Sequence, residues 1–577
     1  MNVKINKILA ACKESLKKNF RFATLDFFFI IAFVTVFQKI FGAENSIVGV
    51  IFTIMMACSM SKDMTSSPVK HFFYQCFILA AMAAAACLVT VLNPAASFFI
   101  NIGMIFIILY LFTYEYSDHL YFPYILSYLF LVFISPVTPD LLPKRLLAML
   151  TGAVCIILYQ FVMGRNKVVE TTKDALSAMI DETCGLMDSL LSGNGSPDTI
   201  EDVRKNLFRL SRMVYDRRKK VLCVSDANFS VIDSGRGLEH LYLLLSDLER
   251  PLSPSRKNLV QSVDKKLRLF QSFIQRDVPE LPPLNRTEFF SGHDDQSAEE
   301  LFEGLEYLQG HLLHMSDPEK RIRYKKTLLS LTVRLKAALD ISPVRVIYAL
   351  RVSLLLAAAA LAVRMLNLPH GKWLLFTIAS VSLPYADAVG QKAKKRFAAT
   401  AIGGMIGLLF YAAIPSAVGR TAVMMLSGYL SFYFTDYTGT FACSTVGALG
   451  AAVFMNMFGW QNVGQMLAVR ISYILLGILV SVIFNILLFP FSRKLATEQL
   501  WKKYASTTKF LTQICRKKDA DPQLYYSLII QSHLLEEKLN KNTSAEGLEK
   551  MKHHLLKCRK RVRTAHRQNT GFLNQSI

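Results

Sequence analysis

Two long apolar blocks, at residues 23–164 and 345–490, constrain the fold more than any other feature of this sequence. Proline, glycine, asparagine or charged residues interrupt each block and divide it into six apolar segments, several of them short. A helix crosses a bilayer with about 20 apolar residues, because it pairs its backbone polar groups internally. The pattern therefore predicts an all-α membrane protein with twelve spans. The predicted spans are 23–41, 46–60, 71–92, 97–113, 120–135 and 144–163, then 346–366, 373–385, 397–414, 420–434, 440–458 and 466–489.

The stretch that follows each block is charged and has the periodicity of soluble helices. We therefore expect two repeated six-helix transmembrane units, each followed by a cytosolic helical domain. The first of these domains is expected to be a bundle of five or six helices. The mean hydropathy of +0.32 argues against a purely cytosolic enzyme. The predicted domains are 1–165 (first transmembrane unit), 166–344 (cytosolic helical domain), 345–490 (second transmembrane unit) and 491–577 (basic cytosolic helical tail).

Nearly half of the net charge of +23 lies in the last part of the chain. Residues 491–577 hold 18 basic and 7 acidic residues, directly after an apolar segment. That position favours retention on the cytoplasmic side of a membrane over binding of nucleic acid. Six Lys and Arg residues also precede the first span. We therefore predict a multi-pass protein of the plasma or inner membrane with both termini in the cytosol.

Motifs for enzymatic chemistry are missing from the sequence. There is no phosphate-binding GxxxxGK[ST] loop, no nucleophile elbow and no zinc-helix pattern, and the ten cysteines lack paired ligand spacing. We therefore expect neither an enzyme nor an ATP-driven pump, and we predict no cofactor and no metal.

The two apolar blocks resemble each other when one is shifted by 324 or 325 residues along the sequence. An even number of spans per unit makes this a parallel repeat, for which a binding site is expected between the halves. The alternative is a duplication that only enlarged a scaffold. The matched pairs include Arg21 with Arg345, Asp63 with Asp387, Lys70 with Lys394, Arg145 with Arg470, and Gly152 with Gly477.

Arginines inside or at the edges of spans are the first candidates for binding an anion. Arg351, Arg470 and Arg145 occupy such positions, where a charged side chain is energetically unfavourable and often functional. A planar guanidinium suits a carboxylate because it donates two parallel hydrogen bonds. The simpler alternative is that these side chains extend to the lipid headgroups.

A basic run between two spans allows two interpretations. Topology anchors on the cytoplasmic side are the simpler one, and an anion-gathering entrance is the other. The run contains Lys392, Lys394, Lys395 and Arg396.

Coupling to protons requires a carboxyl or imidazole group whose pKa can approach the cytosolic pH. Asp63 and Asp387 are in register between the halves, and Glu115 and Asp436 each lie beside tyrosines. Helix capping or pairing with nearby basic residues is the alternative explanation for Asp63 and Asp387.

The second block resembles the fusaric acid resistance protein-like (FUSC) transporters, which include bacterial exporters of aromatic carboxylic acids. The resemblance covers residues 345–495 and is weak in the first block. It rests on Ala349–Leu350–Arg351, Trp373, Thr377, Lys394 to Arg396, Gly403 to Gly407, Arg470 to Gly477, and Phe489–Pro490 followed by Arg493 and Lys494.

This resemblance implies a six-plus-six membrane architecture and efflux of aromatic or other organic acids, driven by the proton gradient. Trp373 and Thr377 are predicted to join the arginines in binding substrate. A more distant likeness to the plant aluminium-activated malate transporters leaves an anion channel as the alternative. A membrane scaffold or sensor without transport is a third possibility. The expected partners are a small organic anion and the lipid bilayer, and no binding of nucleic acid is expected. A homo-oligomer and accessory efflux proteins are left open.

Overall fold

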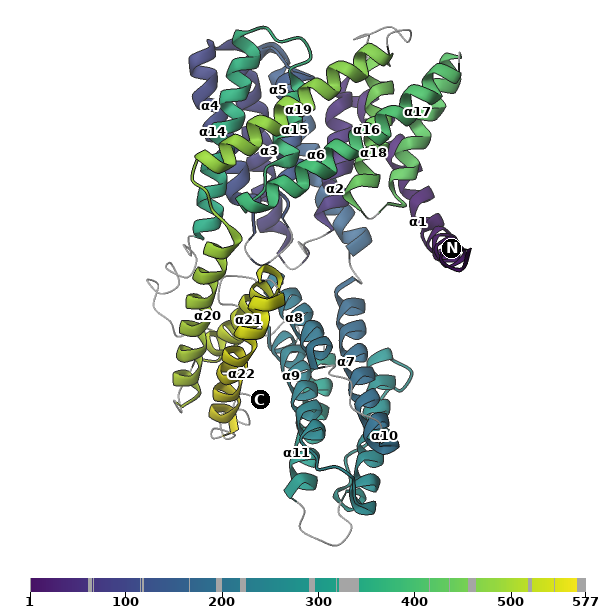
Figure 1. The fold of residues 1–577 in the computed structure, drawn as a ribbon, viewed down its shortest axis with the longest axis vertical. Coiled ribbons are helices and arrows are strands. Elements are labelled where there is room, and N and C mark those ends of the chain that lie inside the picture. Colours follow the sequence, from purple (N-terminus) through teal and green to yellow (C-terminus); the bar gives the residue numbers. More distant parts are fainter. Residues whose placement is uncertain are drawn as a thin grey trace. The chain divides into compact units, whose positions relative to one another are not determined.

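The described part of the chain is helical and contains no strand (Figure 1). Its helices group into two compact units, and each unit is assembled from three separate segments of the chain. Unit 1 comprises Met1–Ser59, Lys70–Ile156 and Ile341–Arg493, and unit 2 comprises Met60–Val69, Ile157–Asp340 and Lys494–Ile577. The computed structural model describes residues 2–60, 65, 67–114, 116, 119–164, 167–193, 200–217, 225–289, 296–317, 319–320, 342–414, 416–434, 436–454, 463–516, 521–543 and 545–567.

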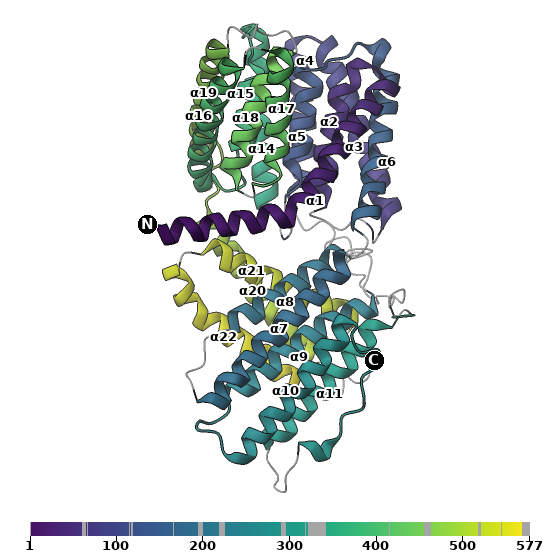
Figure 2. The same ribbon diagram turned by 90° about the vertical axis from the view of Figure 1, so that its right-hand side faces the viewer.

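Unit 1 consists of apolar helices that run side by side (Figure 2). A helix lies at each of the twelve positions where the sequence predicts a span. From the first block come α1 (Asn2–Phe41), α2 (Ser46–Ser59), α3 (Pro68–Val91), α4 (Pro94–Phe112), α5 (Tyr121–Phe133) and α6 (Leu142–Gly164). From the second come α14 (Pro343–Met365), α15 (Lys372–Val381), α16 (Val389–Ala413), α17 (Ala417–Ser431), α18 (Tyr437–Phe454) and α19 (Val463–Leu487).

The twelve helices of unit 1 differ in whether they are long enough to cross a bilayer. Among the described residues, seven helices are long and apolar enough to cross a bilayer: those at Ala23–Phe41, Pro68–Val91, Pro94–Phe112, Pro139–Gly164, Pro343–Met365, Ala386–Ala413 and Val463–Leu487. By contrast, α15 has 10 residues, which at 1.5 Å per residue gives about 15 Å, half of a hydrocarbon core. Twelve full crossings therefore stay a prediction. The backbone N–H and C=O groups next to α15 also need hydrogen-bond partners other than those of a helix.

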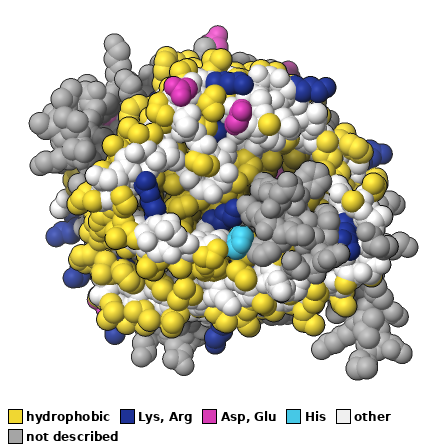
Figure 3. Space-filling view, turned by 90° about the horizontal axis from the view of Figure 1, so that it is seen from above, with side chains coloured by type: hydrophobic (Ala, Val, Ile, Leu, Met, Phe, Trp, Pro, Cys, Tyr) yellow, Lys and Arg dark blue, Asp and Glu magenta, His cyan; other side chains and the backbone are white. Residues whose placement is uncertain are grey.

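Large apolar side chains remain exposed on the outer faces of these helices. Leu409 of α16 is 67% exposed and Leu479 of α19 is 56% exposed. Figure 3, a view from above, shows many hydrophobic side chains at the surface of that end, with Lys and Arg among them. In water such exposure would be unfavourable, whereas lipid tails solvate these side chains well.

Glycines on α16 allow its neighbours to approach closely. A Cβ atom at Gly403 would lie 2.2 Å from the carbonyl oxygen of Ala442 in α18. On the same helix, a Cβ atom at Gly404 would lie 2.3 Å from the side chain of Leu467 in α19. Only a residue without a side chain fits the backbone contact at Gly403, and Gly404 lets the Leu467 side chain lie close to the helix, so α16 packs closely on both α18 and α19.

The Gly403→Ala variant is expected to destabilise the protein by about 1–3 kcal/mol, because the backbone of α18 must move away from the added methyl group. The measurement is the thermal unfolding midpoint of the purified full-length protein in detergent. Gly428→Ala in α17 is the matched control, since a Cβ atom there meets nothing within 4 Å. Alanine has the higher helix propensity, so this control should be neutral or more stable by up to about 1 kcal/mol. Equal midpoints for the two variants would contradict the close approach.

Unit 2 combines the two charged stretches, which the sequence analysis treats as separate domains. Helix α21 packs directly on α8. Leu207 and Leu210 of α8 and Leu535 of α21 are fully buried. The helices of this unit are α7 (Lys167–Ser192), α8 (Ile200–Asp216), α9 (Asp226–Ser246), α10 (Pro254–Gln275), α11 (Gln296–Ser316), α20 (Arg493–Cys515), α21 (Pro522–Asn542) and α22 (Ala545–Arg567).

Candidate functional site

Three basic side chains on α16 and α19 of unit 1 each lie over an aromatic ring. The Cζ atom of Arg470 is 5.4 Å from the ring centroid of Trp373. Arg396 Cζ lies 4.5 Å from the ring centroid of Phe441, and Lys392 Nζ lies 5.1 Å from that of Tyr437. Helices α15, α16, α18 and α19 provide these groups. We call them the cation–aromatic cluster, and it consists of Trp373, Lys392, Arg396, Tyr437, Phe441 and Arg470.

The cluster carries positive charge that its surroundings do not neutralise. Arg396 and Arg470 are each only 6% exposed, and they are close enough to repel each other. The Nε atom of each has no hydrogen-bond partner within the described part of the chain. A ring face contributes about 0.5–2 kcal/mol to each cation, which is less than the cost of burying an unpaired charge. The cluster is therefore suited to receive a negatively charged group.

Acidic residues are scarce around the cluster. The segment 345–490 contains ten Lys and Arg residues but only two acids, Asp387 and Asp436. Asp387 is exposed and accepts a hydrogen bond from the backbone N–H of Arg493 (3.2 Å), at the start of α20. Asp436 is also exposed and accepts one from the backbone N–H of Gly439 (2.8 Å), at the start of α18.

These contacts are those of helix caps. The predicted partners in the first half, Asp63 and Glu115, lie outside the described residues. A role for any of the four in proton coupling stays a prediction.

Arg351 binds backbone oxygens rather than a ring. Its side chain is fully buried in α14, and Nη2 donates to the carbonyl oxygens of Leu383 (2.7 Å) and Pro384 (3.2 Å). Nη1 donates to the carbonyl oxygen of Phe489 (3.4 Å). Helix α15 ends at Val381, so the carbonyls that follow lack helical partners. Arg351 supplies these partners, as buried irregular backbone inside a membrane requires.

Arg145 has a similar environment in the first half. It is 1% exposed, and its Nη2 donates to the carbonyl oxygen of Glu44 (2.9 Å) and to Ser135 Oγ (2.9 Å). Although Arg145 is in register with Arg470 in the sequence, the two guanidinium groups therefore have different partners.

Thr377 packs inside the helical core near the cluster. Its side chain is fully buried, and Oγ1 donates to the carbonyl oxygen of Trp373 (2.8 Å). A Cβ atom at Gly477 would lie 2.9 Å from Thr377 Cβ, so this residue also sets the spacing of α15 and α19. Of the five residues predicted to bind substrate, the structure brings Arg470 and Trp373 together in the cluster. Arg351, Arg145 and Thr377 have local structural contacts, and their binding role stays a prediction.

The basic run 392–396 divides between two environments. Lys394 and Lys395 are exposed, whereas Lys392 is half-buried and Arg396 is buried. Residues four apart lie on one face of a helix, so the sequence already contained the signal that Lys392 and Arg396 point in one direction. The same spacing relates Tyr437 and Phe441 in α18, and the sequence analysis missed both aromatic partners.

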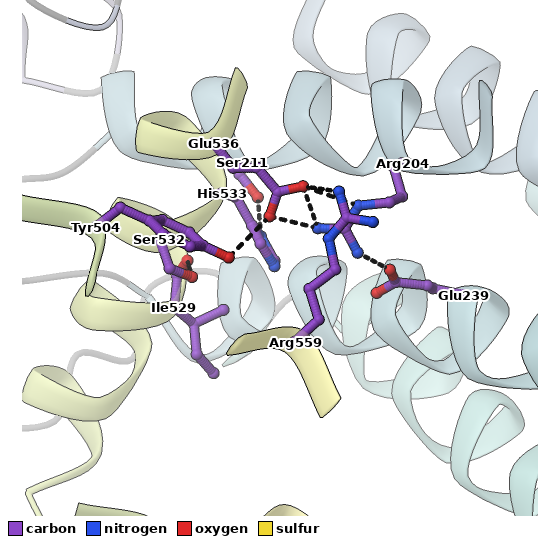
Figure 4. Close-up of polar contacts among 9 residues, drawn as sticks. All are labelled: Arg204, Ser211, Glu239, Tyr504, Ile529, Ser532, His533, Glu536 and Arg559. Atoms are coloured by element: carbon purple, nitrogen blue, oxygen red, sulfur yellow. Dashed lines mark hydrogen bonds and ion pairs between the residues drawn. The ribbon is translucent and has the colours of Figure 1, made fainter. Parts of the chain in front are cut away.

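A second polar cluster lies within unit 2 and was not predicted from the sequence (Figure 4). Glu536 of α21 is 1% exposed, and both of its carboxylate oxygens accept hydrogen bonds from Arg204 Nη2 of α8 (2.8 Å each). Arg559 of α22 also pairs with Glu536. The hydroxyl of Tyr504 in α20 donates to Glu536 Oε2 (3.2 Å). Arg204 in turn pairs with Glu239 of α9.

We call these five residues the Glu536 network. Burial alone would raise the pKa of Glu536, but Arg204 and Arg559 outweigh burial and lower that pKa to about 2. The carboxylate is therefore ionised at any physiological pH, and the network joins helices from both charged stretches. No group of three or more His, Cys, Asp or Glu side chains able to hold a metal ion occurs in the described ranges.

Comparison with known protein families gives a match over the segment that contains the cluster. Residues 356–484 match the family described as fusaric acid resistance protein-like, which confirms the resemblance predicted from the sequence over that segment. All six residues of the cation–aromatic cluster lie inside the match, while Arg351 lies just outside it. No curated protein and no solved structure matches the chain. With its apolar helices, the chain is a multi-pass membrane protein that carries a fusaric acid resistance protein-like domain at residues 356–484.

Proposed function

We propose that this protein is a membrane transporter that moves organic anions, in particular aromatic carboxylates, by way of the cation–aromatic cluster. One observation carries the proposal. Arg396 and Arg470 are buried beside aromatic rings, and their electrostatic neighbours in the described chain include no carboxylate. A carboxylate that loses its hydration in a membrane needs fixed cations in exchange, and guanidinium groups supply them with matched geometry.

The rings of the cluster support an aromatic substrate. Trp373, Tyr437 and Phe441 are partly or largely buried next to the basic groups. Aromatic pairs are more favourable than their buried area alone accounts for, by about 0.5–1.5 kcal/mol. A flat acid therefore gains from both components of the cluster, whereas an inorganic anion gains only from the cations.

A duplicated architecture is part of the proposal, with two six-helix units around the transport path. Matching close contacts in the two halves support it. A Cβ atom at Gly152 of α6 would lie 2.0 Å from the ring of Phe52 in α2, and one at Gly477 of α19 would lie 2.9 Å from Thr377 in α15. The two contacts correspond in sequence, since Gly152 lies 325 residues before Gly477 and Phe52 lies 325 residues before Thr377. The basic loops favour cytosolic termini and cytosolic charged stretches, in a plasma or inner membrane.

Proton-coupled export is the mechanism that we propose, and reconstitution tests it. Purified protein in liposomes with an acidic lumen should accumulate labelled benzoate inside as protons leave. Benzoic acid that leaks through lipid collects on the alkaline side instead, so protein-free liposomes should show the opposite distribution. An anion channel would give a current that follows voltage without a pH gradient. Absence of protein-dependent flux in both experiments would contradict transport and leave a membrane scaffold or sensor.

A further inference from the structure

The cation–aromatic cluster has two separate positive ends. At one end, Arg470 of α19 lies over Trp373 of α15. At the other, Arg396 and Lys392 lie one turn apart on α16, over Phe441 and Tyr437 of α18. The first end has one cation and one ring, the second has two of each, and each end is contributed by its own pair of helices. The two ends are near enough for Arg396 to repel Arg470.

The positive charge at the two ends determines how many negative charges a bound anion must carry. Arg396 and Arg470 are both 6% exposed, and the Nε atom of each lacks a hydrogen-bond partner within the described ranges. Asp387 and Asp436 are the only acids in residues 345–490, and both accept hydrogen bonds from backbone N–H groups elsewhere. A ligand with one negative charge would leave a buried guanidinium unneutralised, whereas two negative charges neutralise both.

The first half does not offer an equivalent end. Arg145, in register with Arg470, donates to the Glu44 carbonyl oxygen and to Ser135. Its guanidinium is therefore already engaged by the protein. Of the two matched arginines, only Arg470 lies over a ring of the cluster, so both positive ends of the cluster belong to the second half.

We infer that the site takes an aromatic dianion, with one carboxylate at Arg470 and the other between Arg396 and Lys392. This inference rests on the proposed transport of organic anions and specifies the charge of the substrate. The substrate class is an aromatic dicarboxylate, whose flat body lies among the rings of the cluster.

Protein-dependent uptake of benzene-1,4-dicarboxylate and of benzoate into proteoliposomes at pH 7 tests the inference. Both carboxyl groups of the dicarboxylate are ionised there. We expect the dicarboxylate to be transported with a kcat/KM about tenfold or more above that of benzoate, because only it engages both cationic ends.

Arg396→Gln should lower uptake of both acids but that of the dicarboxylate more, so that the ratio of dicarboxylate to benzoate uptake falls by about tenfold, since Arg470 still binds one carboxylate. Lys395→Gln is the matched control, because Lys395 is the exposed neighbour outside the cluster, and it should leave the ratio of the two fluxes unchanged. Preference of the wild type for benzoate, or an equal loss of both fluxes in Arg396→Gln, would overturn the dianion site while leaving anion transport intact. Absence of both fluxes in the wild type would overturn transport itself.

Discussion

Replacing Glu536 by Ala is expected to destabilise unit 2 by about 3–5 kcal/mol, because it leaves Arg559 without its counter-charge and buried Arg204 with Glu239 alone. Arg204 is 5% exposed and Arg559 is 17% exposed at their side chains, and both point at the Glu536 carboxylate (Figure 4). Hydrogen exchange of the full-length protein in detergent measures the effect. The opening free energy of backbone amides in α8 and α21 should fall, while amides of α16 in unit 1 serve as the internal reference.

Two controls separate this effect from a general loss of charge. Glu249→Ala removes an ion pair with Arg256 in the same unit, but the Glu249 side chain is 88% exposed, so its effect should stay below about 1 kcal/mol. Acid provides the second control. Because the folded pKa of Glu536 is about 2 and the unfolded value is about 4.3, its stabilisation is complete above the unfolded pKa. It should be lost as the pH falls through the range down to the folded value. Unchanged exchange in Glu536→Ala would show that the network does not hold the helices together.

The helices of unit 1 were predictable because hydrophobic runs are a local signal. The first span was expected at 23–41, and the apolar part of α1 ends at Phe41. One clear disagreement among these helices is at α15, which was expected to reach residue 385 and ends at Val381. Pro384 explains the difference, because proline has no N–H and restricts the residue before it. The early end of α15 was therefore predictable from Pro384, but the span was assigned from the length of the apolar run alone.

The Glu536 network could not be predicted in the same way. Arg204 and Glu536 are 332 residues apart, and no local pattern in either helix indicates that they meet. Periodicity identifies the buried face of a helix but not the partner of that face. Arg396 is an intermediate case. Its position on the same helix face as Lys392 could be predicted from their spacing of four residues, but its contact with α18 could not.

Replacing Arg470 by Gln is expected to reduce protein-dependent uptake of aromatic carboxylates by about 10- to 100-fold, because one end of the site loses its only guanidinium. Arg470→Lys keeps the charge but loses the planar fork, so it should retain intermediate activity. The measurement is the same proteoliposome uptake, with the amount of folded protein normalised by size-exclusion chromatography.

Arg345→Gln is the matched control for Arg470→Gln. Arg345 also places its guanidinium over a ring, with Cζ 4.5 Å from the centroid of Tyr110, but this pair joins α14 to α4 outside the cluster. Its loss should affect stability more than uptake per folded molecule. If Arg470→Gln and Arg345→Gln gave the same uptake as the wild type, a buried cation over a ring would be only a packing device in this fold. Loss of uptake in Arg470→Gln alone would instead assign the anion path to the second half, because the guanidinium of Arg145 at the matching position is already bonded to Glu44 and Ser135.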